Sequence, residues 1–281
     1  MKSMKLIAAL AIVSSCSAAL FAINGWNFQT YSTTMTNTGR PGGGEQKRFA
    51  GIETARAKAL KELESYLKSR FGSADPAILK AFSELPRECY TYNYATKVNS
   101  PEFAYSLPAR PMPIGYGSAL SDFLGQGYMT QICQPKPTDV VLEIGTGSGF
   151  QSSWLSKIVK EVYSIEIIKP VGEGVKNLYA PLGITNVHTK VGDGFFGWPE
   201  VQGGFDIIIV TCAAQYVPPA LLAQLKNGGR MICPVGQPYK HGGQFFYIYT
   251  KDAQGKIHSR KDVACYFVPM TGAMMNNAKT K

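Results

Sequence analysis

The chain has 281 residues, of which 45% are hydrophobic and 17% charged, a composition that suits a globular protein with a sizeable core and excludes disorder throughout. Its formal net charge of +10 raises the question of nucleic-acid binding, but the lysines and arginines are scattered, without a run of five or a basic stripe interleaved with aromatic residues. We therefore predict a basic, solvated surface and no nucleic-acid partner.

The first 22 residues have the layout of an export signal. Two lysines precede the apolar run LIAALAIV, and small residues follow it. The run is too short for an ordinary membrane-spanning helix, so residues 1–22 are expected to be a cleaved leader, with Ser17 and Ala19 at the small-residue positions. The alternative is lipidation, because VSSC resembles a bacterial lipoprotein box that ends at Cys16. A buried amino-terminal helix is the other interpretation.

Residues 23–50 are rich in Ser, Thr, Asn and Gly and are predicted to form a flexible linker. Residues 51–138 are predicted to be an amino-terminal helical and loop extension. Within it, 53–71 has helical apolar spacing, and Asp75 can cap a second helix that begins at Pro76. Residues 87–117, rich in Tyr and Pro, are expected to be mostly loop.

Residues 139–281 alternate apolar runs with helical patterns. Strands are predicted in 139–145, 161–168, 186–193, 205–213 and 230–236, with helices between them, the last over 218–229. Such alternation predicts an α/β fold with a Rossmann-like, doubly wound, mostly parallel sheet and helices on both faces. The alternating segments 244–252 and 261–270 predict a β-rich, antiparallel carboxyl-terminal edge.

A glycine-rich turn follows the first of these strands in the stretch VLEIGTGSGF. Its glycines fall at Gly145, Gly147 and Gly149, whereas a dinucleotide-binding turn would place a glycine at Phe150. No GK[ST] follows, which excludes a P-loop. The spacing, with Glu143 before it, is that of S-adenosylmethionine-dependent methyltransferases, and Glu143 would hold the cationic methionine end of this cofactor.

Two further acidic residues stand at the ends of the next two strands. Glu166 is placed to grip the ribose hydroxyls, and Asp193 in the GDG step is placed to reach the adenine amino group. The predicted cofactor site is Glu143, Gly145, Thr146, Gly147, Ser148, Gly149, Glu166, Asp193 and Gly194.

No metal site is predicted. The six cysteines, Cys16, Cys89, Cys133, Cys212, Cys233 and Cys265, form no CxxC pair, which argues against zinc and thioredoxin-like chemistry. None of the three histidines, His188, His241 and His258, stands in a nucleophile-like setting.

The chain resembles the protein-L-isoaspartate O-methyltransferase family over roughly residues 51–272. The segments that carry the resemblance are ILKAFSELPRECY, PMPIGYG, LEIGTGSGFQSSWLSKIVKEVYSIE, VGDGFFGWPE, FDIIIVTCAAQYVPPALLAQLKNGGRMICPVG and FVPMTG. The resemblance implies methyl transfer to the free carboxylate of isoaspartyl residues in damaged proteins, a reaction that proximity and in-line alignment largely drive.

The resemblance also implies where the acceptor binds. Ser121 matches the active-site serine of the family, although it could instead be a helix N-cap. The substrate-binding residues implied are Ile114, Ser118, Ala119, Leu120, Val268, Pro269 and Thr271. The sequence departs from the family in SALSDF, where Ala119 and Phe123 replace a threonine and a proline, so the acceptor is the least specified part of the prediction.

Three hypotheses therefore stand. The first is an isoaspartyl methyltransferase that acts on proteins or peptides as a monomer. The second keeps the fold and cofactor but changes the acceptor. The third is an exported, non-catalytic binding protein that retains the fold. The leader predicts an exported protein that is periplasmic or, if Cys16 is lipidated, anchored at the membrane, whereas the family predicts a cytoplasmic one.

Overall fold

A computed structural model describes residues 23, 25–41, 46–237 and 243–278. Its centre is a seven-stranded sheet with the order β5-β4-β3-β6-β7-β8-β9. The strands are β3 (Val140–Ile144), β4 (Glu161–Glu166), β5 (Val187–Val191), β6 (Phe205–Val210), β7 (Leu225–Gly236), β8 (Gln244–Lys251) and β9 (Ile257–Cys265). Strands β3 to β7 pair in parallel, and β8 and β9 are added antiparallel. The predicted fold class is confirmed, including the antiparallel edge.

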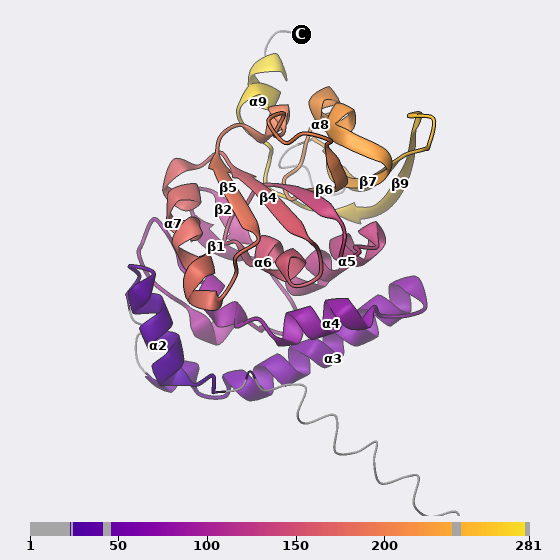
Figure 1. Ribbon diagram of the computed structural model, residues 1–281. Coiled ribbons are helices and arrows are strands. Elements are labelled where there is room, and N and C mark those ends of the chain that lie inside the picture. The colour runs from indigo at the N-terminus through magenta and orange to yellow at the C-terminus, as the bar shows by residue number, and fades with distance from the viewer. Residues whose placement is uncertain (1–22, 24, 42–45, 238–242, 279–281) are drawn as a thin grey trace, which may run out of the picture.

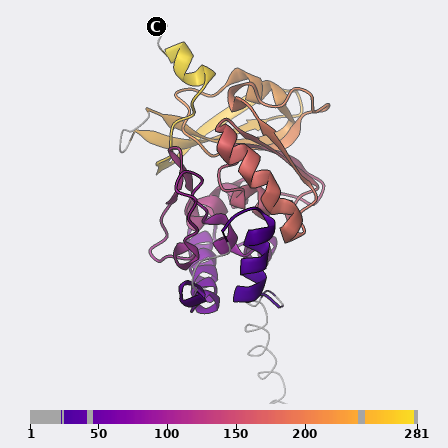
Figure 2. The same cartoon turned by 90° about the vertical axis from the view of Figure 1, so that its left-hand side faces the viewer.

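Helices cover both faces of this sheet (Figures 1 and 2). They are α2 (Phe28–Asn37), α3 (Ile52–Phe71), α4 (Pro76–Ser83), α5 (Phe123–Cys133), α6 (Phe150–Ser156), α7 (Lys169–Tyr179), α8 (Pro219–Gln224) and α9 (Ala273–Ala278). Short 3₁₀ turns are η1 (Gln46–Phe49), η2 (Arg87–Tyr90), η3 (Pro101–Phe103), η4 (Ala180–Leu182) and η5 (Gly194–Phe196). The α3–α4 pair lies at one end of the molecule and α9 at the other (Figure 1).

Both faces of the parallel strands are buried, which explains their continuous apolar sequences. In β3, Val141 belongs to the core that packs on α5, α6 and α7, while Leu142 belongs to the core beneath α8 and α9. Neighbouring residues of a strand point to opposite faces. A strand with one polar face would therefore leave one of these helical layers without an apolar partner.

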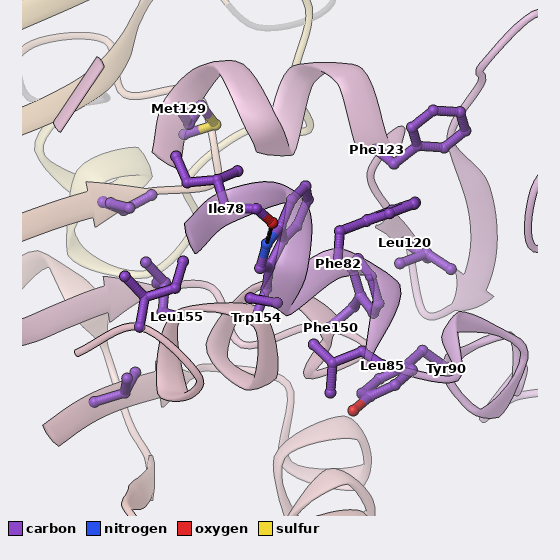
Figure 3. Packing of buried hydrophobic residues seen from close by; sticks show 14 of the residues in the cluster. Ile78, Phe82, Leu85, Tyr90, Leu120, Phe123, Met129, Phe150, Trp154 and Leu155 are labelled. Carbon is purple, nitrogen blue, oxygen red and sulfur yellow. Dashed lines mark hydrogen bonds between the residues drawn. The ribbon is translucent and has the colours of Figure 1, made fainter. Parts of the chain in front are cut away.

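An aromatic cluster joins the amino-terminal helices to the sheet layer (Figure 3). Phe82 of α4 packs against Phe123, Phe150 and Trp154, with ring centroids 5.6, 6.2 and 5.1 Å away. The indole of Trp154 donates a hydrogen bond of 2.9 Å to the Ile78 carbonyl, so its polar atom is satisfied inside the core. This packing makes the amino-terminal extension part of the core.

The amino-terminal extension also contributes a small hairpin. Strands β1 (Met112–Gly115) and β2 (Ser118–Leu120) pair antiparallel, beside the carboxyl ends of the parallel strands. Asp75 caps α4 as predicted, and its carboxylate accepts from Ala77 N–H at 2.8 Å. The residue that caps α5 is Asp122, whose carboxylate accepts from Gly125 N–H at 2.7 Å, so Ser121 is not an N-cap.

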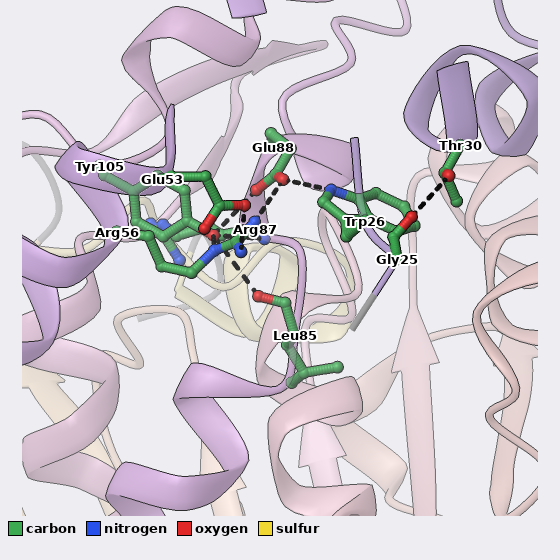
Figure 4. A network of polar contacts seen from close by, with 9 residues as sticks. All are labelled: Gly25, Trp26, Thr30, Glu53, Arg56, Leu85, Arg87, Glu88 and Tyr105. Atoms are coloured by element: carbon green, nitrogen blue, oxygen red, sulfur yellow. Dashed lines mark hydrogen bonds and ion pairs between the residues drawn. The ribbon is translucent and has the colours of Figure 1, made fainter. Parts of the chain in front are cut away.

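The described part of 23–50 differs from the flexible linker that composition predicts. Helix α2 buries Tyr31 and Met35 completely. The Trp26 indole donates to buried Glu88 at 2.7 Å (Figure 4), and Arg40 donates to the Cys89 carbonyl at 3.1 Å. A few large side chains dock this polar segment onto the body. A prediction from overall composition misses them, because Ser, Thr, Asn and Gly outnumber them.

The segment predicted as one helix over 218–229 is also different. Helix α8 ends at Gln224, and β7 begins at Leu225, which pairs with Phe205 across an irregularity in the register. Gly228 has φ 81°, a left-handed conformation that a helix does not allow. Among the described helices none is long and apolar enough to cross a membrane. The predicted leader and Cys16 lie outside the described residues.

Candidate active site

A cavity of about 280 Å³ opens where β3, β4 and β6 end, next to the β1–β2 hairpin. In open parallel sheets this edge is where ligands bind. The cavity brings together most of the predicted site residues, namely Ser118, Ala119, Ser121, Glu143, Gly145, Thr146, Gly147, Ser148, Glu166, Asp193, Gly194, Val268, Pro269 and Thr271. Residues from five separate stretches of the sequence therefore line one cavity.

The backbone of the glycine turn lies so close to neighbouring side chains that a residue with a Cβ would not fit at some of its positions. Gly145 has φ 96°, and a Cβ there would collide with the Thr211 hydroxyl. That hydroxyl donates to the Gly145 carbonyl at 2.7 Å and ties the turn to the end of β6. Gly149 is the left-handed residue before α6 and faces Val175 of α7. Gly149 is not among the lining residues, so its role is to pack the turn.

Glu143 is fully buried and lines the cavity. One carboxylate oxygen accepts from the Ser164 hydroxyl, while the other, Oε1, has no hydrogen-bond partner within the described structure. Burial raises the pKa of Glu143 to about 8, and the hydroxyls of Ser164 and Ser152 oppose the rise. A buried carboxyl group with an unsatisfied oxygen is suited to bind a cation, because it gains both a charge partner and a hydrogen bond.

Glu166 holds the glycine turn in place. Its carboxylate accepts from Gly147 N–H at 2.8 Å and from Ile168 N–H at 2.9 Å. Burial raises the pKa of Glu166, and these backbone donors oppose the rise because they favour the carboxylate. Each oxygen keeps a second lone pair. The predicted contact with ribose hydroxyls stays a prediction.

Asp193 joins η5 to the carboxyl-terminal helix. One oxygen accepts from Phe195 N–H at 2.9 Å, and the other accepts from Ala273 N–H at 2.7 Å. The second bond attaches the start of α9 beside the cavity, a contact that sequence spacing does not reveal. Asp193 lines the cavity, and its predicted contact with adenine is likewise untested.

The segment 118–121 forms one wall of the cavity, which the late segment 266–271 also lines. Ser121 is half-buried, and its carbonyl accepts a 2.5 Å hydrogen bond from the guanidinium of Arg87. Arg87 is itself buried and also donates to the Ala104 carbonyl and to the Gln126 side chain, each at 2.8 Å. One side chain thus joins three chain segments behind the wall.

Two predicted substrate residues do not reach the cavity. Ile114 and Leu120 belong to the hydrophobic core, with exposed fractions of 0% and 1%. In the strand alternation of the hairpin they point inward, and they support the wall without lining it. Lining residues that sequence reasoning missed include Tyr116, Gln126, Gln151, Thr211, Cys212 and Tyr266. Thr211 was detectable, since it is the polar residue that ends the FDIIIV strand.

The described histidines lie away from the cavity lining. His188 contacts Glu161 and His258 contacts Asp252, each pair separated by 2.8 Å on the surface. His241 lies outside the described residues. Within the described ranges no group of three His, Cys, Asp or Glu side chains is arranged to hold a metal ion.

The sheet order, the glycine turn and the acidic strand ends define a class of protein, the Rossmann-like methyltransferases. Comparison with known proteins narrows the class. The model of the family described as protein-L-isoaspartate(D-aspartate) O-methyltransferase matches residues 58–275, and the chain belongs to this family. The match includes the hairpin, the cofactor turn and the late segment.

Individual relatives agree with this assignment. The chain is 40% identical over 223 residues to protein-L-isoaspartate O-methyltransferase 2 of Syntrophobacter fumaroxidans, covering 78% of this chain and 86% of the relative. It is 45% identical over 170 residues to protein-L-isoaspartate O-methyltransferase 1 of Nitrosospira multiformis, covering 60% and 70%. A solved protein-L-isoaspartate O-methyltransferase superposes with a TM-score of 0.66 at 27% identity, covering 78% of this chain and 69% of that one.

A second solved structure shares the fold at 21% identity. It is a protein-L-isoaspartate O-methyltransferase from Plasmodium falciparum, described as putative and in complex with S-adenosyl-L-homocysteine. The TM-score is 0.59, with 75% of this chain and 97% of that chain covered.

Proposed function

We propose that this chain transfers the methyl group of S-adenosylmethionine to the free carboxylate of L-isoaspartyl residues in damaged proteins. The observation that carries the proposal is a single cavity. It combines the glycine turn and Glu143 with Ser121 and the late segment, in a chain that belongs to the isoaspartyl methyltransferase family. The residues proposed to bind the cofactor and those proposed to bind the acceptor therefore line the same cavity.

The residues present fit the cofactor. The unsatisfied Oε1 of Glu143 matches an ammonium group, and Gly145 and Gly147 of the turn line the same cavity. Glu166 and Asp193 stand at the neighbouring strand ends. When bound, S-adenosylmethionine supplies a methyl group activated by a positively charged sulfur.

The protein has little acid–base work to do in this reaction. An acceptor carboxylate is already ionised near neutral pH, so no general base has to remove a proton. What the site supplies is position, and effective molarity from alignment is large. Ser121 would donate to one acceptor oxygen and leave the other free to attack, and Arg87 would fix the backbone that carries Ser121.

Cofactor titration by calorimetry separates the enzyme from the non-catalytic binding protein. We expect saturable binding of S-adenosylmethionine and of S-adenosylhomocysteine by the wild-type protein. A matched variant, Gly145→Val, should not bind, because a side chain there collides with the Thr211 hydroxyl. Absence of binding by the wild type would contradict the proposal.

The acceptor deserves its own test, because Ala119 and Phe123 replace two family residues in SALSDF. Both lie near Ser121, and Phe123 is buried against Phe82, so its side chain belongs to the core. Ala119 lines the cavity and lacks the hydroxyl of the threonine that the family has at this position. The Ala119→Thr variant, which restores the hydroxyl, should still methylate an isoaspartyl peptide. If only this variant methylated the peptide and the wild type did not, the natural acceptor would be a different one.

We also propose that the chain is a monomer exported by a leader within 1–22. The leader is cleaved off, or, if the lipoprotein box is used, the chain is anchored through a lipidated Cys16. The support is the sequence pattern alone. Mass spectrometry of the mature amino terminus tests both routes. An intact Met1 would favour a cytoplasmic protein, and light scattering of the purified chain would reveal a dimer.

A further inference from the structure

Two glutamines that sequence reasoning did not mark line the methyl-transfer cavity. Gln126 belongs to α5 and Gln151 to α6. Both side chains are buried, with exposed fractions of 5% and 3%. A buried amide costs free energy unless its N–H and C=O groups find partners, so the direction in which each amide points indicates the ligand group that it can bind.

The amide of Gln126 is oriented by Arg87. Its Oε1 accepts from the guanidinium of Arg87 at 2.8 Å. A guanidinium only donates, so the amide oxygen has to face Arg87, and the Nε2 group with its two N–H donors faces the other way. No hydrogen bond among the described residues uses this Nε2. Arg87 is not a lining residue, so the nitrogen is the end of the Gln126 amide that is directed to the cavity.

The amide of Gln151 presents the opposite end. Its Nε2 donates to the Thr130 hydroxyl at 2.8 Å, and this hydroxyl donates in turn to the backbone carbonyl of Gln126 at 2.8 Å. The Oε1 of Gln151 has no hydrogen-bond partner within the described structure. A carboxylate has only acceptor oxygens, so it finds no donor at Gln151 but finds two at Gln126.

Gln126 also stands beside the serine proposed to bind the acceptor. The guanidinium that bonds Gln126 donates to the Ser121 carbonyl at 2.5 Å. The planar fork of a guanidinium holds its partners in a fixed geometry, which places the Gln126 amide next to the Ser121 backbone. On the same wall, Ala119 lacks the hydroxyl of the family's threonine. Gln126 therefore offers a donor on a wall that has one hydroxyl fewer.

The amide carries the influence of a buried charge to the cavity. A hydrogen bond from a charged donor polarises an amide and strengthens the N–H groups at its other end. A guanidinium in direct contact with the acceptor would make the attacking oxygen less nucleophilic and would repel the positive sulfur of the cofactor. Because Gln126 lies between them, Arg87 stays behind the wall and the acceptor meets a neutral donor.

We propose that Gln126 is an acceptor-binding residue whose Nε2 donates to one oxygen of the isoaspartyl carboxylate, beside the Ser121 hydroxyl, and leaves the other oxygen free to attack. The inference rests on the proposed function and adds to it the residue that selects the acceptor group. The bond is stronger to an ionised carboxylate than to a neutral carboxamide, so Gln126 favours the group that can be methylated.

The variant that tests this role is Gln126→Glu, which keeps the shape and still offers an oxygen to Arg87. If Gln126 were only a partner for Arg87, glutamate would serve equally well. We expect instead that kcat/KM for an isoaspartyl peptide falls about ten- to hundredfold, mainly through KM, because a donor is lost and a negative charge faces the acceptor. Calorimetric affinity for S-adenosylmethionine should not fall. Gln202→Glu, an exposed change of equal charge outside the cavity lining, should keep wild-type kinetics.

A second variant and a peptide pair complete the test. Gln126→Met removes the donor without adding a charge and should lower kcat/KM about tenfold. The peptide pair consists of an isoaspartyl peptide and its twin with the free carboxylate converted to a carboxamide, and binding is measured with S-adenosylhomocysteine present. Wild type should bind the carboxylate peptide about tenfold more tightly. Gln126→Glu should lose or reverse this preference, because its oxygen can accept from the carboxamide.

The outcomes separate the role of Gln126 from the proposed function. If the wild type methylates the isoaspartyl peptide and both Gln126 variants keep its KM and its preference for the carboxylate twin, Gln126 does not bind the acceptor, while the proposed function stands. If the wild type binds the cofactor but methylates no isoaspartyl peptide, the proposed function is wrong, and the role of Gln126 is wrong with it.

Discussion

Glu143 makes cofactor affinity depend on pH. Burial raises the pKa of its carboxyl group to about 8, so without a cationic partner the group is mostly neutral at lower pH. A cationic cofactor group favours the carboxylate, and binding below pH 8 must therefore release a proton. We predict that affinity for S-adenosylmethionine rises from pH 6 to about pH 8 and then levels off, as calorimetry at several pH values would show.

The matched control is Glu143→Gln, which keeps the shape and loses the charge. It should weaken binding about ten- to hundredfold at pH 8, in line with a hydrogen bond to a charged group, and it should flatten the pH dependence. If Glu143→Gln showed the wild-type pH profile, another group would be responsible for the titration.

Ser121 is predicted to act on the acceptor and not on the cofactor. Ser121→Ala should lower kcat/KM for an isoaspartyl peptide by about tenfold or more, because a hydrogen bond to a carboxylate is lost. Its affinity for S-adenosylmethionine should not change. Steady-state kinetics combined with calorimetry checks both parts, and unchanged kinetics would remove Ser121 from the mechanism.

At the scale of elements, η2 positions the hairpin wall through Arg87. Burial lowers the pKa of Arg87 to about 10, although Tyr105 and Asp122 oppose the change, so Arg87 still carries its charge near neutral pH. Arg87→Lys keeps a cation but cannot reach the Ala104 carbonyl, the Ser121 carbonyl and Gln126 together. We predict that this variant raises the acceptor KM about tenfold while cofactor affinity stays within twofold. An equal loss of cofactor binding would indicate general disruption.

The elements differ in how far the sequence predicts them. Runs such as VVLEI and FDIIIV identify the parallel strands, since burial on both faces demands apolar residues at every position. All the residues predicted for the cofactor site line one cavity except Gly149, which packs the turn, and their contacts with the cofactor stay predictions. The acceptor wall depends on the bond from Arg87 to Ser121, and α9 is attached by the bond from Ala273 to Asp193, and both bonds join residues 34 or more positions apart. Such pairings have no local periodicity and become visible only in the folded chain.

At the scale of the whole molecule, a buried polar network ties the amino-terminal segment to the catalytic body (Figure 4). Glu88 accepts from Trp26 at 2.7 Å, from Arg56 at 2.6 Å and from Tyr105 at 2.8 Å. Tyr105 in turn accepts from Arg87 N–H at 3.0 Å. Residues 26–40 precede the region that the family model matches, yet they contribute to the same structure.

We therefore predict that Trp26→Phe lowers the free energy of unfolding by about 1.5–3 kcal/mol, because one bond to a buried carboxylate is lost. Urea denaturation measures this change. The control is Lys68→Met, which breaks an exposed pair with Glu64 and should change stability by less than about 1 kcal/mol. Equal stability of Trp26→Phe and wild type would mean that the segment is not coupled to the body.

The identity of the acceptor can be decided in one assay. Purified full chain is incubated with S-adenosylmethionine carrying a labelled methyl group and with two peptides that differ only in an L-isoaspartyl or an ordinary aspartyl linkage. We predict a base-labile methyl ester on the isoaspartyl peptide and none above background on its aspartyl twin. Equal labelling of both peptides, or labelling of neither by a protein that binds the cofactor, would contradict the account.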